Sequence, residues 1–301
     1  MSTEIIRSLE NGDLPAAKEV WLASFVEDPP EFPDYYFRAR TSPERMLALF
    51  ERGDGSEGER LLSMLCYDPV KMQLGGEETV QAAFVAGVCT MPEARRRGYV
   101  RRLLDELALR LEGDGFAALL LVPFDFDFYR KLGFYSYARR RLVSFSKADR
   151  ARLDSRFDSA AAMEPDPAML NSIYSRYMQK RRGALVRDEA YFGALLEEYS
   201  GGGGHALAVR ADGGEAYCLF NDAEPAADEF AYTSEAAACA LIAAALEKSE
   251  GLRLPLPLSD APAFIEGARC AEEDFNMLRP LKKSFCELEK NGAAAFDFRK
   301  Y

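Results

Sequence analysis

The sequence predicts an α/β (α+β) protein in which a mixed, mostly antiparallel sheet is flanked by helices, and it predicts that this arrangement occurs twice in tandem. Three observations support the prediction. Apolar runs separated by turn residues follow one another over residues 60–90, which is typical of an antiparallel meander. The apolar period then becomes helical over residues 98–112, and a short continuous apolar run follows at 116–122. After a polar stretch at 146–168, a similar order of elements returns more weakly.

Helices are expected before the meander. Residues 14–26 carry apolar side chains at helical spacing and predict a first helix. The prolines of residues 27–40 forbid a long helix there, so we expect a loop followed by a short helix. Residues 43–50 predict another helix, with Pro43 in its first turn. The strands expected after them are 60–67, 69–74 and 79–90.

The first half is expected to close with helix, strand, helix and strand. The helix over 98–112 has one apolar face, formed by Leu103, Leu104, Leu107 and Leu111. The apolar run at 116–122 predicts a buried strand, which Pro123 ends. A short helix is expected next, followed by Gly133 as its C-cap and by a strand over 134–145.

The second half predicts a weaker copy of the same fold. We place a first domain at 1–145, a linker at 146–168 and a second, degenerate domain at 169–301. The elements expected there are helices near 167–180, 187–199, 235–250 and 261–269, a hairpin over 205–220, and strands near 229–234, 251–258 and 275–281.

Composition excludes several classes of protein. The 38 Lys and Arg residues against 49 Asp and Glu give a net charge of −11, whereas nucleic-acid-binding proteins are usually basic. A cationic or amine-bearing partner fits this balance, and so does a simple role in solubility. No run approaches the roughly 18 apolar residues that span a bilayer, and the N-terminus lacks a signal-peptide pattern, so we expect a cytoplasmic protein without a membrane partner.

Cysteine and histidine, the residues that form disulfides and bind zinc, follow no recognisable motif in this sequence. Six cysteines are scattered without paired spacing, so we expect reduced thiols. With His205 as the single histidine, the sequence offers no plausible zinc site and makes a Ser-His-Asp hydrolase improbable, so no metal is expected.

Residues 85–111 contain the strongest indication of a ligand-binding site. Five of the eight residues from Arg95 to Arg102 are arginine, and they lie where a predicted strand passes through a tight loop into a helix. The N-terminus of a helix offers free backbone N–H groups and a positive dipole end, which suits a pyrophosphate. Gly98 lacks a Cβ, so the backbone can approach a phosphate closely. A solvated basic helix start and an RNA-binding patch are the alternatives.

The same loop resembles motif A of the GNAT N-acetyltransferases, R/Q-x-x-G-x-G/A. The motif reads here Arg95-Arg96-Arg97-Gly98-Tyr99-Val100, with Val100 in place of the usual Gly or Ala. The resemblance implies that acetyl-CoA is the cofactor. It implies that the strand end Val88-Cys89-Thr90 bonds the pantetheine arm through its backbone, and that the amides of Arg96 to Arg101 hold the diphosphate.

A second segment, residues 128–134, is similar to the FYxKxGF segment of the same family. In many members its tyrosine protonates the departing thiolate of coenzyme A, and by resemblance this residue is Tyr129. A tyrosine of pKa about 10 is protonated at pH 7 and can donate to a thiolate of pKa about 8.5. The alternative is a packed aromatic side chain on a helix. The two segments occur in the family's order, which makes the pairing specific.

The tandem copies, the Arg-Arg-Arg-Gly sequence and residues 173–192 resemble the Eis-like (enhanced intracellular survival) branch of this superfamily. Members of that branch usually add a sterol-carrier-like third domain, most of which is absent here. In that branch the C-terminal carboxylate has been assigned as a base, so Tyr301 becomes a candidate. From the residues alone, Glu27, Asp28 and Asp34 are further candidate bases or substrate ligands, although exposed acids are usually only solvated charges.

The predicted activity is direct transfer of an acetyl group from acetyl-CoA to a primary amine. The acceptor is expected to be a small-molecule or peptide amine, and a homo-oligomer is possible. The alternative is a module that binds coenzyme A as a sensor or in an assembly, without turnover. A third class, RNA binding through Arg95–Arg102 and Arg139–Arg141, fits the charge balance least well.

Overall fold

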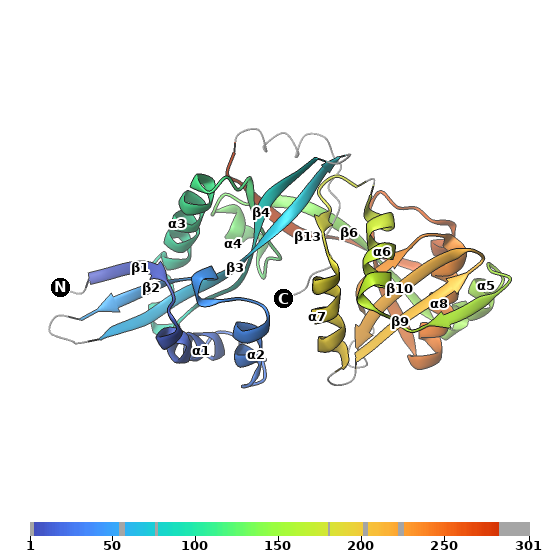
Figure 1. Cartoon of the computed structure of the whole chain (residues 1–301), viewed down its shortest axis with the longest axis horizontal. Coiled ribbons are helices and arrows are strands. Elements are labelled where there is room, and N and C mark those ends of the chain that lie inside the picture. Colours follow the sequence, from blue (N-terminus) through green and yellow to red (C-terminus); the bar gives the residue numbers. More distant parts are fainter. Residues whose placement is uncertain are drawn as a thin grey trace.

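The computed structural model describes residues 3–53, 58–75, 78–179, 181–200, 204–221 and 226–282. Two sheets, each covered by helices, lie beside one another along the long axis of the molecule (Figure 1). The helices are α1 (Leu14–Leu22), α2 (Phe32–Ala39), α3 (Tyr99–Gly113), α4 (Phe126–Arg130), α5 (Arg150–Asp154), α6 (Pro167–Met178), α7 (Glu189–Ser200) and α8 (Glu235–Lys248). The strands are β1 (Thr3–Ser8), β2 (Met46–Arg52), β3 (Glu59–Gly75), β4 (Glu78–Thr90), β5 (Ala118–Leu121), β6 (Tyr135–Ser146), β7 (Ala160–Met163), β8 (Leu185–Val186), β9 (Gly204–Ala211), β10 (Gly214–Asn221), β11 (Ala227–Tyr232), β12 (Gly251–Pro257) and β13 (Arg269–Pro280). The predicted mixed, mostly antiparallel sheet flanked by helices is confirmed, and the second sheet fits a tandem arrangement.

The first sheet draws strands from both ends of the described chain. Its order is β1-β2-β3-β4-β5-β13-β6-β12, with β8 paired to β3. Neighbouring strands are antiparallel except for β4 and β5, which are parallel. Strand β13 lies between β5 and β6, where Met277 pairs with Leu121 on one side and with Ser136 on the other. The sheet that begins at the N-terminus is therefore completed by the last described strand.

Helices cover both faces of this sheet. The buried leucines of α3, all on one side of the helix as its spacing predicts, pack with Tyr129 of α4 against β2–β5. On the opposite face, Trp21 of α1 and Tyr36 of α2 pack over β3 and β4. The sheet is thus the middle layer of a three-layer α/β/α arrangement.

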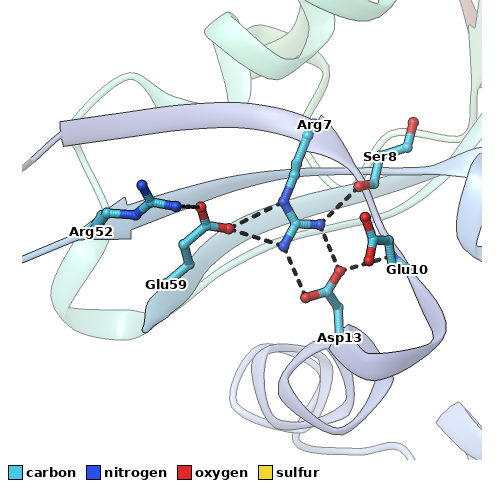
Figure 2. A network of polar contacts seen from close by, with 6 residues as sticks. All are labelled: Arg7, Ser8, Glu10, Asp13, Arg52 and Glu59. Atoms are coloured by element: carbon cyan, nitrogen blue, oxygen red, sulfur yellow. Dashed lines mark hydrogen bonds and ion pairs between the residues drawn. The ribbon is translucent and has the colours of Figure 1, made fainter. Parts of the chain in front are cut away.

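Strand β1 is held at the edge of the sheet by a charged network. The Arg7 guanidinium donates hydrogen bonds to Asp13 at 2.7 Å and to Glu59 at 3.0 Å, and Glu59 also accepts from Arg52 (Figure 2). The Arg7 guanidinium also lies 3.9 Å from the Phe50 ring centre. The hydrogen bond from Arg7 holds the pKa of Asp13 below its usual value. This network joins β1 to β3 and to the turn before α1.

The second sheet has four described strands in the order β11-β10-β9-β7. Helix α8 packs on one face of this sheet, and α6 and α7 pack on the other. The Ser234 hydroxyl caps α8 by accepting a hydrogen bond from the Ala237 amide. A parallel bridge between Ala226 and Arg253 connects this sheet to β12 of the first sheet.

Three local predictions are wrong. Residues 43–50 are not a helix: a 3-10 turn at Pro43–Arg45 leads into β2, whose first five residues are all buried between two strands. A short apolar run fits a buried strand as well as a helix, and strand pairing decided the outcome here. Residues 60–67 and 69–74 form one strand, β3. The helix expected at 261–269 is only a 3-10 turn, Ala263–Ile265, between Pro262 and the left-handed Gly267.

The stretch predicted as a linker is largely structured. It contains a 3-10 turn (Lys147–Asp149), α5 and β7, and β7 is an edge strand of the second sheet. Conversely, β12 and β13 belong to the first sheet. The first sheet therefore takes β8, β12 and β13 from the second half of the sequence, and the domain limits at 145 and 168 stay predictions.

Candidate cofactor-binding and catalytic site

Strands β4 and β5 separate part of the way along the sheet. Their parallel pairing ends at Phe84 and Leu120, whereas β4 continues to Thr90. In the part of the chain that the structure describes, the last six residues of β4 therefore have no pairing with β5. The two strands form a fork that opens toward the loop before α3.

A β-bulge in β4 accompanies the fork. Strand β3 pairs Met64 with Cys89 but Cys66 with Ala86, so β4 holds one more residue than β3 in this interval. Gly87 lies in the bulge with a φ of +58°, and a Cβ there would stand 2.6 Å from a ring carbon of Trp21. Glycine is required at this position for its backbone angle and for space. Because a bulge bends its strand, it is the local cause of the fork.

The three residues at the end of β4 differ in what their backbone can still bind. The Cys89 carbonyl accepts from the Ser63 hydroxyl at 2.9 Å, and the Thr90 carbonyl accepts from Ser24 and from Arg95, each at 3.2 Å. Val88, in the bulge, has no register partner on β3 or β5 among the described strands. Of the predicted pantetheine-binding residues, Val88 is therefore the one that lies in the bulge, whereas the carbonyls of Cys89 and Thr90 already accept hydrogen bonds from side chains.

The loop before α3 forms a concave group of backbone amides. Gly98 is the N-cap of α3 with a φ of +78°, and a Cβ at this position would meet nothing within 4 Å. Arg96 also has a left-handed backbone, with a φ of +65°. Within the described chain, the amides of residues 96–101 donate no hydrogen bond to another protein group. Free N–H groups at a helix N-terminus, combined with left-handed residues, form the kind of nest that binds anions.

Several of the loop arginines are used to hold the loop in place. The Arg95 side chain donates to the carbonyls of Thr90 and Ala23, at 3.2 and 3.3 Å. Arg101 donates to the Lys131 carbonyl at 2.6 Å, which ties the first turn of α3 to the end of α4. Arg96 is exposed and makes no such contact with the described chain. Its side chain is therefore the one most available to a ligand.

Tyr99 has a structural side chain. Its ring is buried in the core under α3, and its hydroxyl donates to Glu4 of β1 at 2.6 Å. Arg102 forms an ion pair with the same carboxylate. The hydrogen bonds from Tyr99 and Arg102 lower the pKa of Glu4. Only the backbone of Tyr99 is thus left for a ligand.

Tyr129 lies in α4, in the same apolar cluster as Val88 and Val100. Its ring makes edge contacts with Phe124, Phe128 and Phe134 and is 3% exposed. Burial alone raises the pKa of the Tyr129 hydroxyl. No hydrogen bond from this hydroxyl occurs within the described chain, so it stays protonated and uncommitted.

Two candidate carboxylates, Glu27 and Asp28, lie in the loop between α1 and α2, and the third, Asp34, lies in the first turn of α2. This loop is fastened to the end of β4, because Ser24 and Arg95 join it to Thr90 as described above. Asp28 accepts a hydrogen bond from the Trp21 indole at 2.7 Å, and Asp34 pairs with Lys18 at 2.6 Å. Glu27 is exposed. Tyr301 lies outside the described residues.

Sequence reasoning missed two features of this site. Gly87 interrupts an apolar strand, and an isolated glycine in a strand signals a bulge, so its role was readable from the sequence. The left-handed backbone of Arg96 had no such signal, because arginine rarely adopts that conformation.

The second arginine run is part of the sheet. On β6 and β13, Arg139 pairs with Asp274, Arg140 with Glu273 at 2.6 Å, and Arg141 with Glu272 at 3.1 Å. These arginines fix the register of β13 and have their charge balanced there. Among the described residues, no group of His, Cys, Asp and Glu is arranged to hold a metal ion, and no helix is long and apolar enough to cross a membrane.

Residues 5–138, which contain the forked β4–β5 pair and the amide-lined loop before α3, match the family model of the acetyltransferase (GNAT) domain. The match covers 134 of the 301 residues. No curated protein matches the sequence.

Solved structures extend the likeness over most of the chain. A GCN5-related N-acetyltransferase from Kribbella flavida is 22% identical with a TM-score of 0.72, over 93% of this chain and 71% of that one. Eis1 from Mycobacterium abscessus is 17% identical with a TM-score of 0.68, over 92% and 74%. A protein from Enterococcus faecalis V583, described as a probable N-acyltransferase, is 14% identical with a TM-score of 0.73, over 93% and 73%. At these identities the likeness concerns the fold, which resembles that of the Eis-like tandem proteins.

Proposed function

We propose that this protein transfers an acetyl group from acetyl-CoA to a primary amine, with Tyr129 as the general acid. The observation that carries the proposal is the fork itself. An anion-binding group of amides lies at its open end, and a protonated, buried tyrosine lies in the cluster beside it.

The residues present fit coenzyme A. The open space at Gly98 and the free amides of residues 96–101 suit a diphosphate, to which Arg96 adds a charge-assisted contact. The end of β4 beyond its pairing with β5, which includes Val88 in the bulge, suits the amide groups of a pantetheine arm, which would add as a strand does. When bound there, acetyl-CoA supplies the activated acyl group and a thiolate leaving group.

Tyr129 acts on the sulfur side of the reaction. Since its pKa is raised by burial, the phenol is protonated throughout the neutral range. It can then donate its proton to the sulfur as the carbon–sulfur bond breaks. Its packing against Phe128 and Phe134 holds the ring in position.

A carboxylate must take the proton of the attacking amine, because only a neutral amine is nucleophilic. Among the three candidates, Asp28 accepts a hydrogen bond from Trp21 and Asp34 pairs with Lys18, whereas Glu27 is exposed and has no ion pair with the described chain. We propose Glu27 as the first choice among these, with Asp28 as a second ligand for a cationic acceptor. The C-terminal carboxylate of Tyr301 stays a proposal from the resemblance.

The second sheet is proposed to shape the acceptor side and not to bind cofactor. The N-cap of α8 is Ser234, whose hydroxyl already satisfies the Ala237 amide. A side chain at Gly214 is excluded as well, since a Cβ there would lie 1.9 Å from the Ser234 hydroxyl. The cytoplasmic location and the homo-oligomer stay predictions.

The test is an acceptor screen by thiol release. The protein is incubated with acetyl-CoA and a panel of small amines, polyamines and lysine peptides, and free thiol is followed with time. Amine-dependent release supports the transferase. Calorimetric binding of acetyl-CoA without release for any amine would favour the sensor instead.

A further inference from the structure

Phe124 is an aromatic side chain that is largely exposed at the end of the β5 arm of the fork. Four large apolar side chains are exposed among the described residues: Val26, Leu109, Phe124 and Val186. Phe124 is 76% exposed and follows the end of β5, on the arm of the fork opposite to β4. It alone of the four touches Tyr129, with the ring centres 5.6 Å apart at an angle of 72°.

Helix capping explains only part of this contact. Asp125 caps α4 by accepting from the Phe128 amide at 3.0 Å. Phe124 and Tyr129 then occupy the two positions of a hydrophobic staple, which fixes the entry of a chain into a helix. Phe124 also contacts Phe128, with the ring centres 5.3 Å apart. Its side chain stays largely exposed in spite of both contacts, and Phe124 belongs to none of the apolar clusters.

The position of the ring matches the path of the proposed cofactor. Tyr129 shares its cluster with Val88 on one arm of the fork and with Val100 at the start of α3. An extended chain that runs from the α3 loop along Val88 toward Tyr129 therefore approaches the ring that leans on Tyr129. Such a chain would cover apolar surface that is otherwise in contact with water.

We propose that the exposed face of Phe124 is a positioning surface for the thioester end of acetyl-CoA, which packs on the ring and is held next to the Tyr129 hydroxyl. The inference rests on the proposed function. It assigns to Phe124 binding of the pantetheine–acyl part of the cofactor and no contact with its adenosine and phosphate part.

Two ligands separate these parts. Calorimetry measures the affinity for acetyl-CoA and for adenosine 3′,5′-bisphosphate, which lacks the pantetheine arm. The variants are Phe124→Ala, Phe124→Leu as the conservative replacement, and Leu109→Ala as a matched control, since Leu109 is 69% exposed on α3. The melting temperature of each variant shows how much the staple contact between Phe124 and Tyr129 contributes to stability.

The expected result is an acetyl-CoA affinity about tenfold weaker in Phe124→Ala, or about 1.4 kcal/mol, with the affinity for the bisphosphate unchanged. Phe124→Leu should recover most of the loss, and Leu109→Ala should bind like the wild type. Equal weakening for both ligands, or a lowered melting temperature with unchanged acetyl-CoA affinity, overturns the inference in favour of a staple alone. If the wild type does not bind acetyl-CoA, the proposed function itself fails.

Discussion

The Arg101 guanidinium donates a hydrogen bond to the carbonyl of Lys131 at 2.6 Å. This contact joins the first turn of α3, where the amides converge, to the end of α4, where Tyr129 lies. Two motifs that are separate in the sequence are thus in direct contact. The loop proposed to bind the diphosphate and the candidate acid Tyr129 are held relative to each other by this interaction.

The first prediction concerns Gly98. Gly98→Asp should weaken acetyl-CoA binding more than tenfold, because a carboxylate would occupy the space proposed for the diphosphate. Gly98→Ala is the matched control, since its Cβ meets no atom and only the left-handed backbone is strained, by about 1 kcal/mol. Both variants should lose a similar few degrees of melting temperature. Calorimetric affinities that are equal for Gly98→Asp and the wild type would remove the loop from the site.

The second prediction separates the backbone of Arg96 from its side chain. Arg96→Gly removes the strain of a φ of +65°, which offsets the greater freedom of glycine in the unfolded state, whereas Arg96→Ala keeps the strain. Arg96→Gly should therefore melt at a higher temperature than Arg96→Ala. Both should bind acetyl-CoA about three- to tenfold more weakly, because both lack the guanidinium. Wild-type affinity in both variants would show that the side chain does not contact the cofactor.

The third prediction concerns Tyr129. Tyr129→Phe retains the ring and its packing, so it should lower kcat at least tenfold while acetyl-CoA affinity stays within about threefold. Thiol release and calorimetry on the two proteins measure these quantities. An unchanged kcat would reject the acid role.

The pH dependence gives an independent check on Tyr129. Because burial raises its pKa in the folded protein, the phenol keeps its proton above the unfolded value of about 10. The stabilisation from this shift is present in full below pH 10 and is lost as the pH rises through the folded pKa. Because the proposed acid keeps its proton over this range, kcat should not decrease between pH 8 and about 10. A kcat that halves near pH 8 would assign the proton donor to another group.

The fourth prediction concerns the second sheet. Arg187 and Glu229 form an ion pair of 2.6 Å with both side chains at most 2% exposed, and Tyr191 donates to the same carboxylate at 3.1 Å. Glu229→Gln leaves a buried cation without its counter-charge and should cost about 3–5 kcal/mol of unfolding free energy in urea. Acetyl-CoA affinity should be unaffected at a temperature where the variant is folded. A parallel loss of affinity would show that the second sheet contributes to cofactor binding.

Local patterns predicted the geometry of the loop before α3 better than they predicted the sheet. The loop before α3 was predictable because its residues act through local geometry, with Gly98 as an open cap and arginines beside a helix start. Strand β2 was not, since Met46–Phe50 is a short apolar run whose partners β1 and β3 decide its conformation. The insertion of β13 between β5 and β6 depends on pairing between the two halves of the chain. Local hydrophobic periodicity carries no information about such long-range pairing. The exposure of Phe124 is likewise a tertiary property, because the same aromatic-rich segment contains Tyr129 and Phe134, which are buried.

The most direct test of the account is transfer of a labelled acetyl group. The protein is incubated with acetyl-CoA labelled in the acetyl group and with a mixture of primary amines, and mass spectrometry follows the amines while free thiol is titrated. The account predicts labelled N-acetyl product in an amount equal to the thiol released, with both reduced at least tenfold in Tyr129→Phe. Thiol release without acetylated amine, or bound acetyl-CoA with no thiol release for any amine, would contradict it.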